Sequence, residues 1–256
     1  MLLVAACAST PQVPPPARAE LAPTGTLRAG INYGNVILAQ KDKATGESSG
    51  VAIDLARELA KRLGVPVEVI GYESVGAMVD GAQAGSWDIA FLGADPARAA
   101  EITFTPAYVE LEATYLVAAG SPLRAVADVD REGVRVAAPA RANYELYLSR
   151  SLTRAQLVRA QDAAAAFDLL ASGKVEALAG LTQALIGLSA KLPGSRLVDG
   201  RFMAVQQSVG VPKGRDAGAT YLRGFVEEAK ASGLVAQAIQ KTGAVGVSVA
   251  PKAPAQ

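Results

Sequence analysis

The chain has 256 residues, of which 50% are apolar, so it is long enough to bury one large core or two smaller ones. Its 25 basic and 24 acidic residues almost cancel, which argues against nucleic acid as a partner, because such a surface needs clustered positive charge. The lack of histidine removes the commonest general base, and a single cysteine excludes an internal disulfide and a cysteine-cluster metal site. We therefore expect a globular protein without a metal or another cofactor.

The first residues have the pattern of a shortened lipoprotein signal at residues 1–7. The letters VAAC at residues 4–7 fit a lipobox that ends at Cys7, although the basic and apolar regions of a full signal are missing or cut short. Residues 8–23 are rich in proline, which is typical of an extended spacer. We predict a lipid on Cys7 that tethers a periplasmic or cell-surface protein to the membrane. The alternative is a cysteine buried as a small apolar residue.

From residue 26 onward, short apolar runs alternate with segments of helical periodicity. Strands are predicted at residues 26–31, 66–70, 88–92, 102–105, 113–118, 134–138, 157–160, 177–180, 196–198 and 205–211. Helices are predicted at residues 53–63, 74–84, 96–101, 143–151, 163–171, 183–191, 217–231 and 235–241. This alternation predicts an α/β fold with mainly parallel sheets flanked by helices.

One sequence pattern occurs twice: the end of a helix, a glycine, an acid and then a strand. Its two copies are AGSWDIA at residues 84–90 and SGKVEAL at residues 172–178. Two similar α/β lobes would produce this repetition, and so would chance, because such connections are common.

Further short motifs lie around these two. They are GVAIDLA at residues 50–56, RAAEITFTPAY at residues 98–108 and SVGVPKG at residues 208–214. Together with GSWD and GKVEA, they resemble in order and spacing the motifs of the bacterial extracellular solute-binding proteins, family 3. The resemblance covers residues 26–242 and implies a type II periplasmic-binding-protein fold with two hinge strands. It places the first lobe at residues 24–110 and 206–250, the second at residues 111–205, and a tail at residues 251–256.

The resemblance also implies a function. Members of this family close around a small solute and present it to the permease of an ABC importer. We therefore expect a monomeric binding protein for a small carboxylate or amino acid rather than an enzyme. One alternative is a dehydratase of the cyclohexadienyl type on the same fold, in which Glu145 or Asp95 would serve as acid or base. Another is a ligand sensor with a separate signalling partner.

Arg98 is the residue that the resemblance assigns to the ligand carboxylate, because a guanidinium matches two oxygens and keeps its charge. The alternative is a surface arginine, solvated or paired with Glu101. In the opposite lobe, the resemblance places helix-terminal amides at Ala142 and Asn143, which would bind an anion. Arg141 would add positive charge at the cleft mouth or remain solvated.

The loop after the first strand carries Asn32, Tyr33 and Asn35. Asn35 stands where family members place an aromatic cover, which Tyr33 would supply instead. Because Asn32 cannot neutralise a cation, a lysine- or arginine-type ligand is disfavoured. The alternative for these residues is turn chemistry. The remaining lining predicted from the resemblance is the side chains of Val75 and Leu92 and the carbonyl of Gly93.

Leu181 stands where the family places the acid that binds the α-ammonium of the ligand. An unpaired buried ammonium is costly, so either the ligand lacks that group or another acid replaces it. Asp95 is the candidate, although the Asp-Pro pair is also typical of a helix N-cap. Glu110 and Glu112 are further alternatives.

Overall fold

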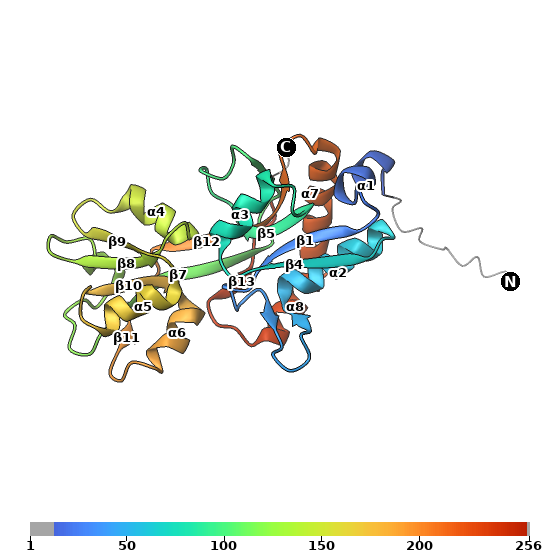
Figure 1. The fold of residues 1–256 in the computed structure, drawn as a ribbon. Coiled ribbons are helices and arrows are strands. Elements are labelled where there is room, and N and C mark those ends of the chain that lie inside the picture. The colour runs from blue at the N-terminus through green and yellow to red at the C-terminus, as the bar shows by residue number, and fades with distance from the viewer. Residues whose placement is uncertain (1–12, 255–256) are drawn as a thin grey trace.

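Two groups of parallel strands lie at opposite ends of an elongated molecule (Figure 1). The computed structural model describes residues 13–254. The strands of the first lobe are β4 (Val67–Tyr72), β1 (Leu27–Asn32) and β5 (Ile89–Gly93). Those of the second are β10 (Ala177–Leu181), β8 (Arg135–Pro139) and β9 (Gln156–Ala160). In a parallel sheet the carboxyl ends of the strands share one edge, which is where ligands bind in α/β proteins.

Two long antiparallel strands join the lobes. They are β7 (Val109–Val117) and β12 (Met203–Pro212), which pair with each other. At one end β12 pairs with β5, and at the other β7 pairs with β10, so one continuous path of strands runs through the molecule. The predicted two-lobed α/β fold with two hinge strands is confirmed. The exact lobe boundaries stay a prediction, since positions 110/111 and 205/206 fall within these strands.

The helices cover the faces of the two lobes (Figure 1). In the first lobe they are α1 (Pro15–Leu21), α2 (Val51–Leu63), α3 (Val75–Gln83), α7 (Asp216–Ala231) and α8 (Leu234–Thr242). In the second they are α4 (Asn143–Ser151), α5 (Ala163–Ala171) and α6 (Thr182–Ser189), with a 3-10 turn at Val126–Asp128. No helix in residues 13–254 combines the length and the apolar character that crossing a membrane requires.

The remaining strands are short. They are β2 (Gln40–Lys41), β3 (Ser48–Ser49), β6 (Ile102–Phe104), β11 (Arg196–Leu197) and β13 (Val247–Val249). The sequence prediction missed the β2–β3 hairpin and β13, because two- and three-residue strands leave no periodic pattern. The helix predicted at residues 96–101 forms hydrogen-bonded turns instead of a helix.

The N-terminal segment differs from the predicted spacer. Pro15 and Pro16 open α1, where the missing amide hydrogens of proline cost nothing. Ala17 and Leu21 are buried, and α1 packs on α7. The predicted linker at residues 8–23 is therefore wrong from residue 15 onward, because that segment is part of the first lobe. Residues 1–12, with the signal and Cys7, lie outside the described residues.

The repeated acid at each strand entry has the same role in both lobes. Asp88 accepts hydrogen bonds from the backbone amide and the guanidinium of Arg28, and Glu176 accepts the same pair from Arg135. In each case the acid ties the start of one strand to a neighbouring strand. Asp88 is fully buried and also pairs with Arg215. The two lobes thus share a local structure, which corresponds to the sequence pattern that occurs twice.

We predict that Asp88→Ala lowers the free energy of unfolding by about 3–5 kcal/mol, because two arginines lose their buried partner. Urea unfolding followed by circular dichroism measures the change. The control is Glu47→Gln, which removes an exposed pair with Arg57 and should leave the urea midpoint unchanged. Equal midpoints for the two variants would contradict the structural role of Asp88.

Candidate functional site

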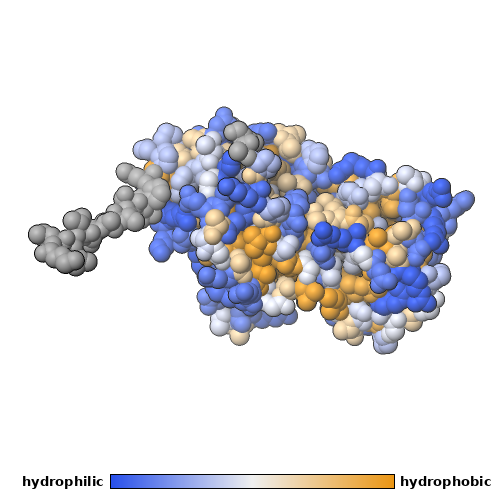
Figure 2. Space-filling model, turned by 180° about the vertical axis from the view of Figure 1, so that it is seen from behind, coloured by the Kyte–Doolittle hydropathy of each residue, from blue (hydrophilic) through white to orange (hydrophobic). Residues whose placement is uncertain are grey.

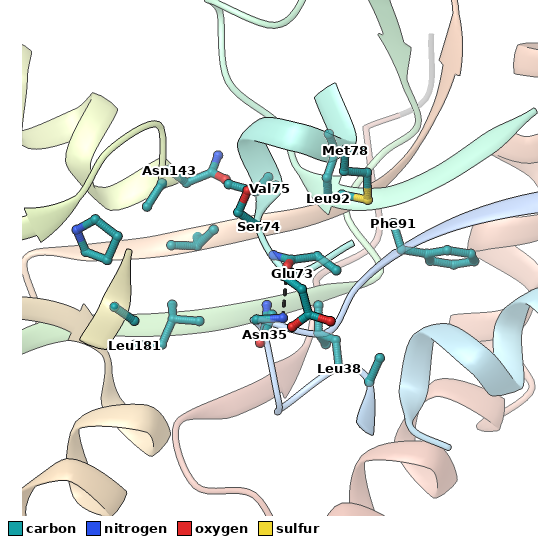
Figure 3. A pocket seen from close by; sticks show the side chains of 18 of the residues that line it. Asn35, Leu38, Glu73, Ser74, Val75, Met78, Phe91, Leu92, Asn143 and Leu181 are labelled. Atoms are coloured by element: carbon teal, nitrogen blue, oxygen red, sulfur yellow. Dashed lines mark hydrogen bonds between the residues drawn. The ribbon is translucent and has the colours of Figure 1, made fainter. Parts of the chain in front are cut away.

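A cavity of 140 Å³ lies between the lobes and is lined by residues of both. All six parallel strands end at it, so its wall combines β-strand ends with the loops and helices that follow them. The wall is mostly apolar, and Figure 3 shows side chains such as Leu38, Met78 and Leu92 around it. The residues that follow or close the six strands here are Asn32, Glu73, Gly93, Pro139, Gln161 and Leu181.

A smaller apolar pocket of 70 Å³ adjoins this cavity and shares Asn35, Pro139 and Leu181 with it. Its other walls include β10 and α6 of the second lobe and Val36 and Ile37 of the first. Figure 2 shows apolar side chains gathered where the two lobes meet, on the face opposite to that of Figure 1. The site therefore offers space for an apolar group.

Most of the residues predicted to line the site do line the cavity. They are Asn32, Asn35, Val75, Leu92, Gly93, Ala142, Asn143 and Leu181. Contact of these residues with a ligand stays a prediction. Tyr33, Asp95 and Arg98 do not line the cavity.

Arg98 connects the two lobes. Its NH1 donates to the Gly93 carbonyl at 2.6 Å and to Asn143 Oδ1 at 2.7 Å, and its NH2 donates to the Arg141 carbonyl at 2.7 Å. Only 5% of Arg98 is exposed, so the alternative of a surface arginine is wrong. Burial lowers the pKa of its guanidinium to about 10, which leaves it charged at neutral pH. Capture of a ligand carboxylate by Arg98 stays a prediction, since a ligand oxygen would have to replace one of these acceptors.

Two further ion pairs cross the cleft. Arg150 donates to Asp95 Oδ2 at 2.9 Å, and Arg141 makes a two-pronged contact with Asp80 at 2.7 and 3.0 Å. Arg141 thus pairs with an acid of the first lobe, although both side chains remain exposed to solvent. Together with Arg98, these contacts connect the two lobes across the cleft.

Asp95 does not take the place of the missing amine-binding acid. Its Oδ1 accepts from the Ala97 amide, as in the N-cap alternative, and its Oδ2 from Arg150. The other two alternatives are also engaged elsewhere, because Glu110 accepts from Gln206 and Glu112 pairs with Arg201. None of the three acids lines the cavity. The prediction for Asp95 is corrected accordingly.

The loop after β1 is held by turn chemistry. Asn32 Oδ1 accepts from the Gly34 amide at 3.0 Å while the residue lines the cavity. Tyr33 points elsewhere, because its hydroxyl bonds to Ser48 and its ring lies against Gly71. Tyr33 therefore does not supply the aromatic cover predicted for it.

Four helices, α2, α3, α4 and α5, begin at the cavity, with first-turn residues in its wall. Helix N-termini carry positive partial charge from unpaired amides. Ser74 caps α3 and Asp162 caps α5 with their side chains, whereas the N-terminus of α4 at Ala142 has no side-chain cap. The Ala142 amide donates to the Pro139 carbonyl at 3.4 Å. Binding of an anion by the amides at Ala142 and Asn143 stays a prediction.

The sequence analysis missed several polar lining residues. They are Glu73, Ser74, Tyr144, Gln161, Asp162 and Gln207. Glu73 and Gln161 directly follow β4 and β9, so the rule that parallel strand ends form binding sites would have found them. In residues 13–254 no group of three histidine, cysteine or acidic side chains is arranged to hold a metal ion.

Comparison with known proteins assigns this fold to a protein family. Residues 27–243 match the model of the bacterial extracellular solute-binding proteins, family 3. The chain belongs to this family. No curated protein sequence matches it closely enough to add to that assignment.

Several solved structures share the fold of this solute-binding protein. An amino acid ABC transporter substrate-binding protein from Streptococcus pneumoniae, bound to L-arginine, has a TM-score of 0.74 at 19% identity and covers 91% of this chain and 99% of its own. A binding component of an ABC transporter from Wolinella succinogenes, complexed with lysine, gives 0.73 at 21%, with 85% and 95% covered. An ancestral amino acid-binding protein, a precursor of cyclohexadienyl dehydratase, gives 0.72 at 24%, with 88% and 97% covered.

We predict that Arg98→Ala favours the open arrangement of the unliganded solute-binding protein. The variant loses three charge-assisted hydrogen bonds and leaves the buried Asn143 amide without one partner. Small-angle X-ray scattering should show a larger radius of gyration than for the wild type. Arg131→Ala, which removes only an exposed contact to Asp128, is the control. Identical scattering from all three proteins would refute the closing role of Arg98.

Proposed function

We propose that this protein is the extracytoplasmic solute-binding subunit of an ABC importer and that it delivers a small carboxylate or amino acid to a membrane permease. The observation that carries the proposal is the cavity between two lobes that are joined by the long strands β7 and β12. A hinge of this kind lets the solute enter the open form and be enclosed in the closed one. The lipid anchor at Cys7 and a monomeric state belong to the same proposal.

The site supports a ligand with an anionic end. The uncapped N-terminus of α4 presents amides to the cavity, and Arg98 lies directly behind Asn143 of that helix. A carboxylate at this helix end would gain from both the helix dipole and the nearby guanidinium. The apolar wall would then accept the body of the solute.

We propose binding without turnover. The acids considered for a dehydratase are both engaged in structural contacts, because Glu145 accepts from Arg159 and from the Arg141 amide and Asp95 accepts from Arg150. Glu145 is buried and does not line the cavity. A general acid or base must reach the reacting atoms, and neither side chain is placed to do so.

The first test is a thermal-shift screen against amino acids, their keto and hydroxy analogues, their deaminated and decarboxylated analogues, and dicarboxylates. A solute present at about 100 times its dissociation constant should add about 2.7 kcal/mol to the stability of the folded protein. Prephenate belongs in the same screen, with phenylpyruvate formation followed by absorbance. Turnover of prephenate would overturn the proposal of a pure binding protein.

The second test uses Arg98→Ala with the best solute found and its decarboxylated analogue. If Arg98 captures the carboxylate, the variant should fold but lose the shift from the carboxylate and keep that from the amine. If Arg98 acts only by closing the lobes, both shifts should fall together. Isothermal titration calorimetry separates the two results. An unchanged affinity for both compounds would count against any part of Arg98 in binding.

A further inference from the structure

The hinge strand β12 presents a buried polar side chain to the cavity. Gln207 lines the cavity, and only 5% of the residue is exposed. Among residues 13–254 its carboxamide has no hydrogen-bond partner, although a carboxamide can donate two hydrogen bonds and accept two. A polar group that is left unpaired in a folded interior lowers the stability of the protein. A bound molecule that supplies the missing partner removes this cost.

The carboxamide of Gln207 is accessible from the cavity. Two other side-chain atoms in residues 13–254, Asn35 Oδ1 and Tyr108 Oη, are unpaired and also shut off from accessible space. The carboxamide of Gln207 is unpaired as well, but it keeps accessible surface, and the residue belongs to the cavity wall. A molecule in the cavity can therefore reach it.

The geometry of β12 fixes the direction of this side chain. Successive residues of a strand point to opposite faces, so Val205 and Gln207 line the cavity together. Gln206 lies between them and points the other way, where its Nε2 donates to Glu110 Oε1 at 2.8 Å. The strand thus carries two adjacent glutamines, of which one pairs within the protein and the other faces the space for the solute.

The neighbouring polar side chain is already engaged. Gln207 lies directly opposite Gly93 of β5, and residues in such a pair project from the same face of the sheet, with Cβ atoms about 4.5–5.5 Å apart. A Cβ on Gly93 would collide with Asn143 Oδ1, so Asn143 occupies the space above Gly93. Its carboxamide accepts from Arg98 and donates to the Ala94 carbonyl. The free hydrogen-bonding capacity at this place is that of Gln207.

The part of the wall around Gln207 carries no charged side chain. The other wall residues on β5 and β12 are Phe91, Leu92, Gly93 and Val205. The acids of the wall, Glu73 and Asp162, lie on the segments that follow β4 and β9. Arg98 does not line the cavity, because its guanidinium is bonded to Gly93 and Asn143. A charged group of the solute beside Gln207 would therefore be buried without a counter-charge in the wall, which is costly.

We propose that Gln207 recognises a neutral polar group of the solute, a hydroxyl or a carboxamide, and so determines specificity from the hinge strand. Such a group both donates and accepts, which matches the carboxamide of Gln207. It needs no counter-charge, and an apolar group in its place would leave Gln207 unpaired. This inference rests on the proposed solute-binding function and adds a specificity-determining residue to it.

The experiment compares isosteric probes on matched variants. The probe pairs are threonine and valine, asparagine and leucine, and 4-hydroxybutanoate and pentanoate, and any other solute found in the screen above is paired with its own apolar isostere. Gln207→Leu removes the hydrogen-bonding atoms and keeps a side chain of similar size. Gln206→Leu is the control, because it makes the same exchange on the face that pairs with Glu110.

We expect the polar member of a pair to bind the wild type more tightly than its apolar isostere. Gln207→Leu should raise the dissociation constant of the polar member about three- to tenfold, the loss of one neutral hydrogen bond, without weakening the apolar member. Gln206→Leu should leave both constants unchanged. Isothermal titration calorimetry measures the constants, and melting temperatures without ligand show whether each variant is folded.

The contrary results are distinguishable. A preference for the apolar isosteres, a best solute without a neutral polar group, or a preference that Gln207→Leu leaves unchanged would remove the role of Gln207 and leave the solute-binding function intact. An equal loss for both members of a pair would assign Gln207 to their shared carboxylate and would also overturn the inference. A screen in which no amino acid or carboxylate stabilises the wild type would overturn both proposals.

Discussion

The antiparallel pairing of β7 with β12 is the constraint on which the site depends. These two strands extend the sheet of each lobe into the other, and their register fixes where the lobes face each other. Because both parallel sheets end toward the same gap, six strand ends converge on one cavity. A change of register by one residue would turn every side chain of a strand to its other face, so the buried patterns of β7 and β12 also maintain the cavity.

Charge at the cleft is divided between closing the lobes and meeting the solute. Arg98, Arg141 and Arg150 are all engaged by acceptors across the gap, which leaves the cavity wall itself without a basic side chain. Positive character in the wall comes from helix N-termini, and negative character from Glu73 and Asp162.

The sequence predicted most of the fold because its main signals are local. Apolar runs predicted the strands. The helix α2 was predicted from its periodicity and from Gly64, which ends it in a left-handed conformation. The prediction failed at α1, where three adjacent prolines at Pro14–Pro16 suggested a spacer although two of them occupy the first helical turn. Contacts with α7 and with Leu63 of α2, both far away in the chain, stabilise that segment as a helix.

The site was predictable to the extent that it depends on strand ends. Asn32, Gly93 and Leu181 were placed through the resemblance, and the structure brings them to one cavity. The orientation of Arg98 was not predictable, because it depends on Asn143 and Arg141 of the other lobe coming within reach. The Asn143 side chain accepts from Arg98 through its Oδ1, and its Nδ2 donates to the Ala94 carbonyl. A side chain of the second lobe thus sets the orientation of an arginine in the first, and this contact between distant parts of the chain has no local sequence signal.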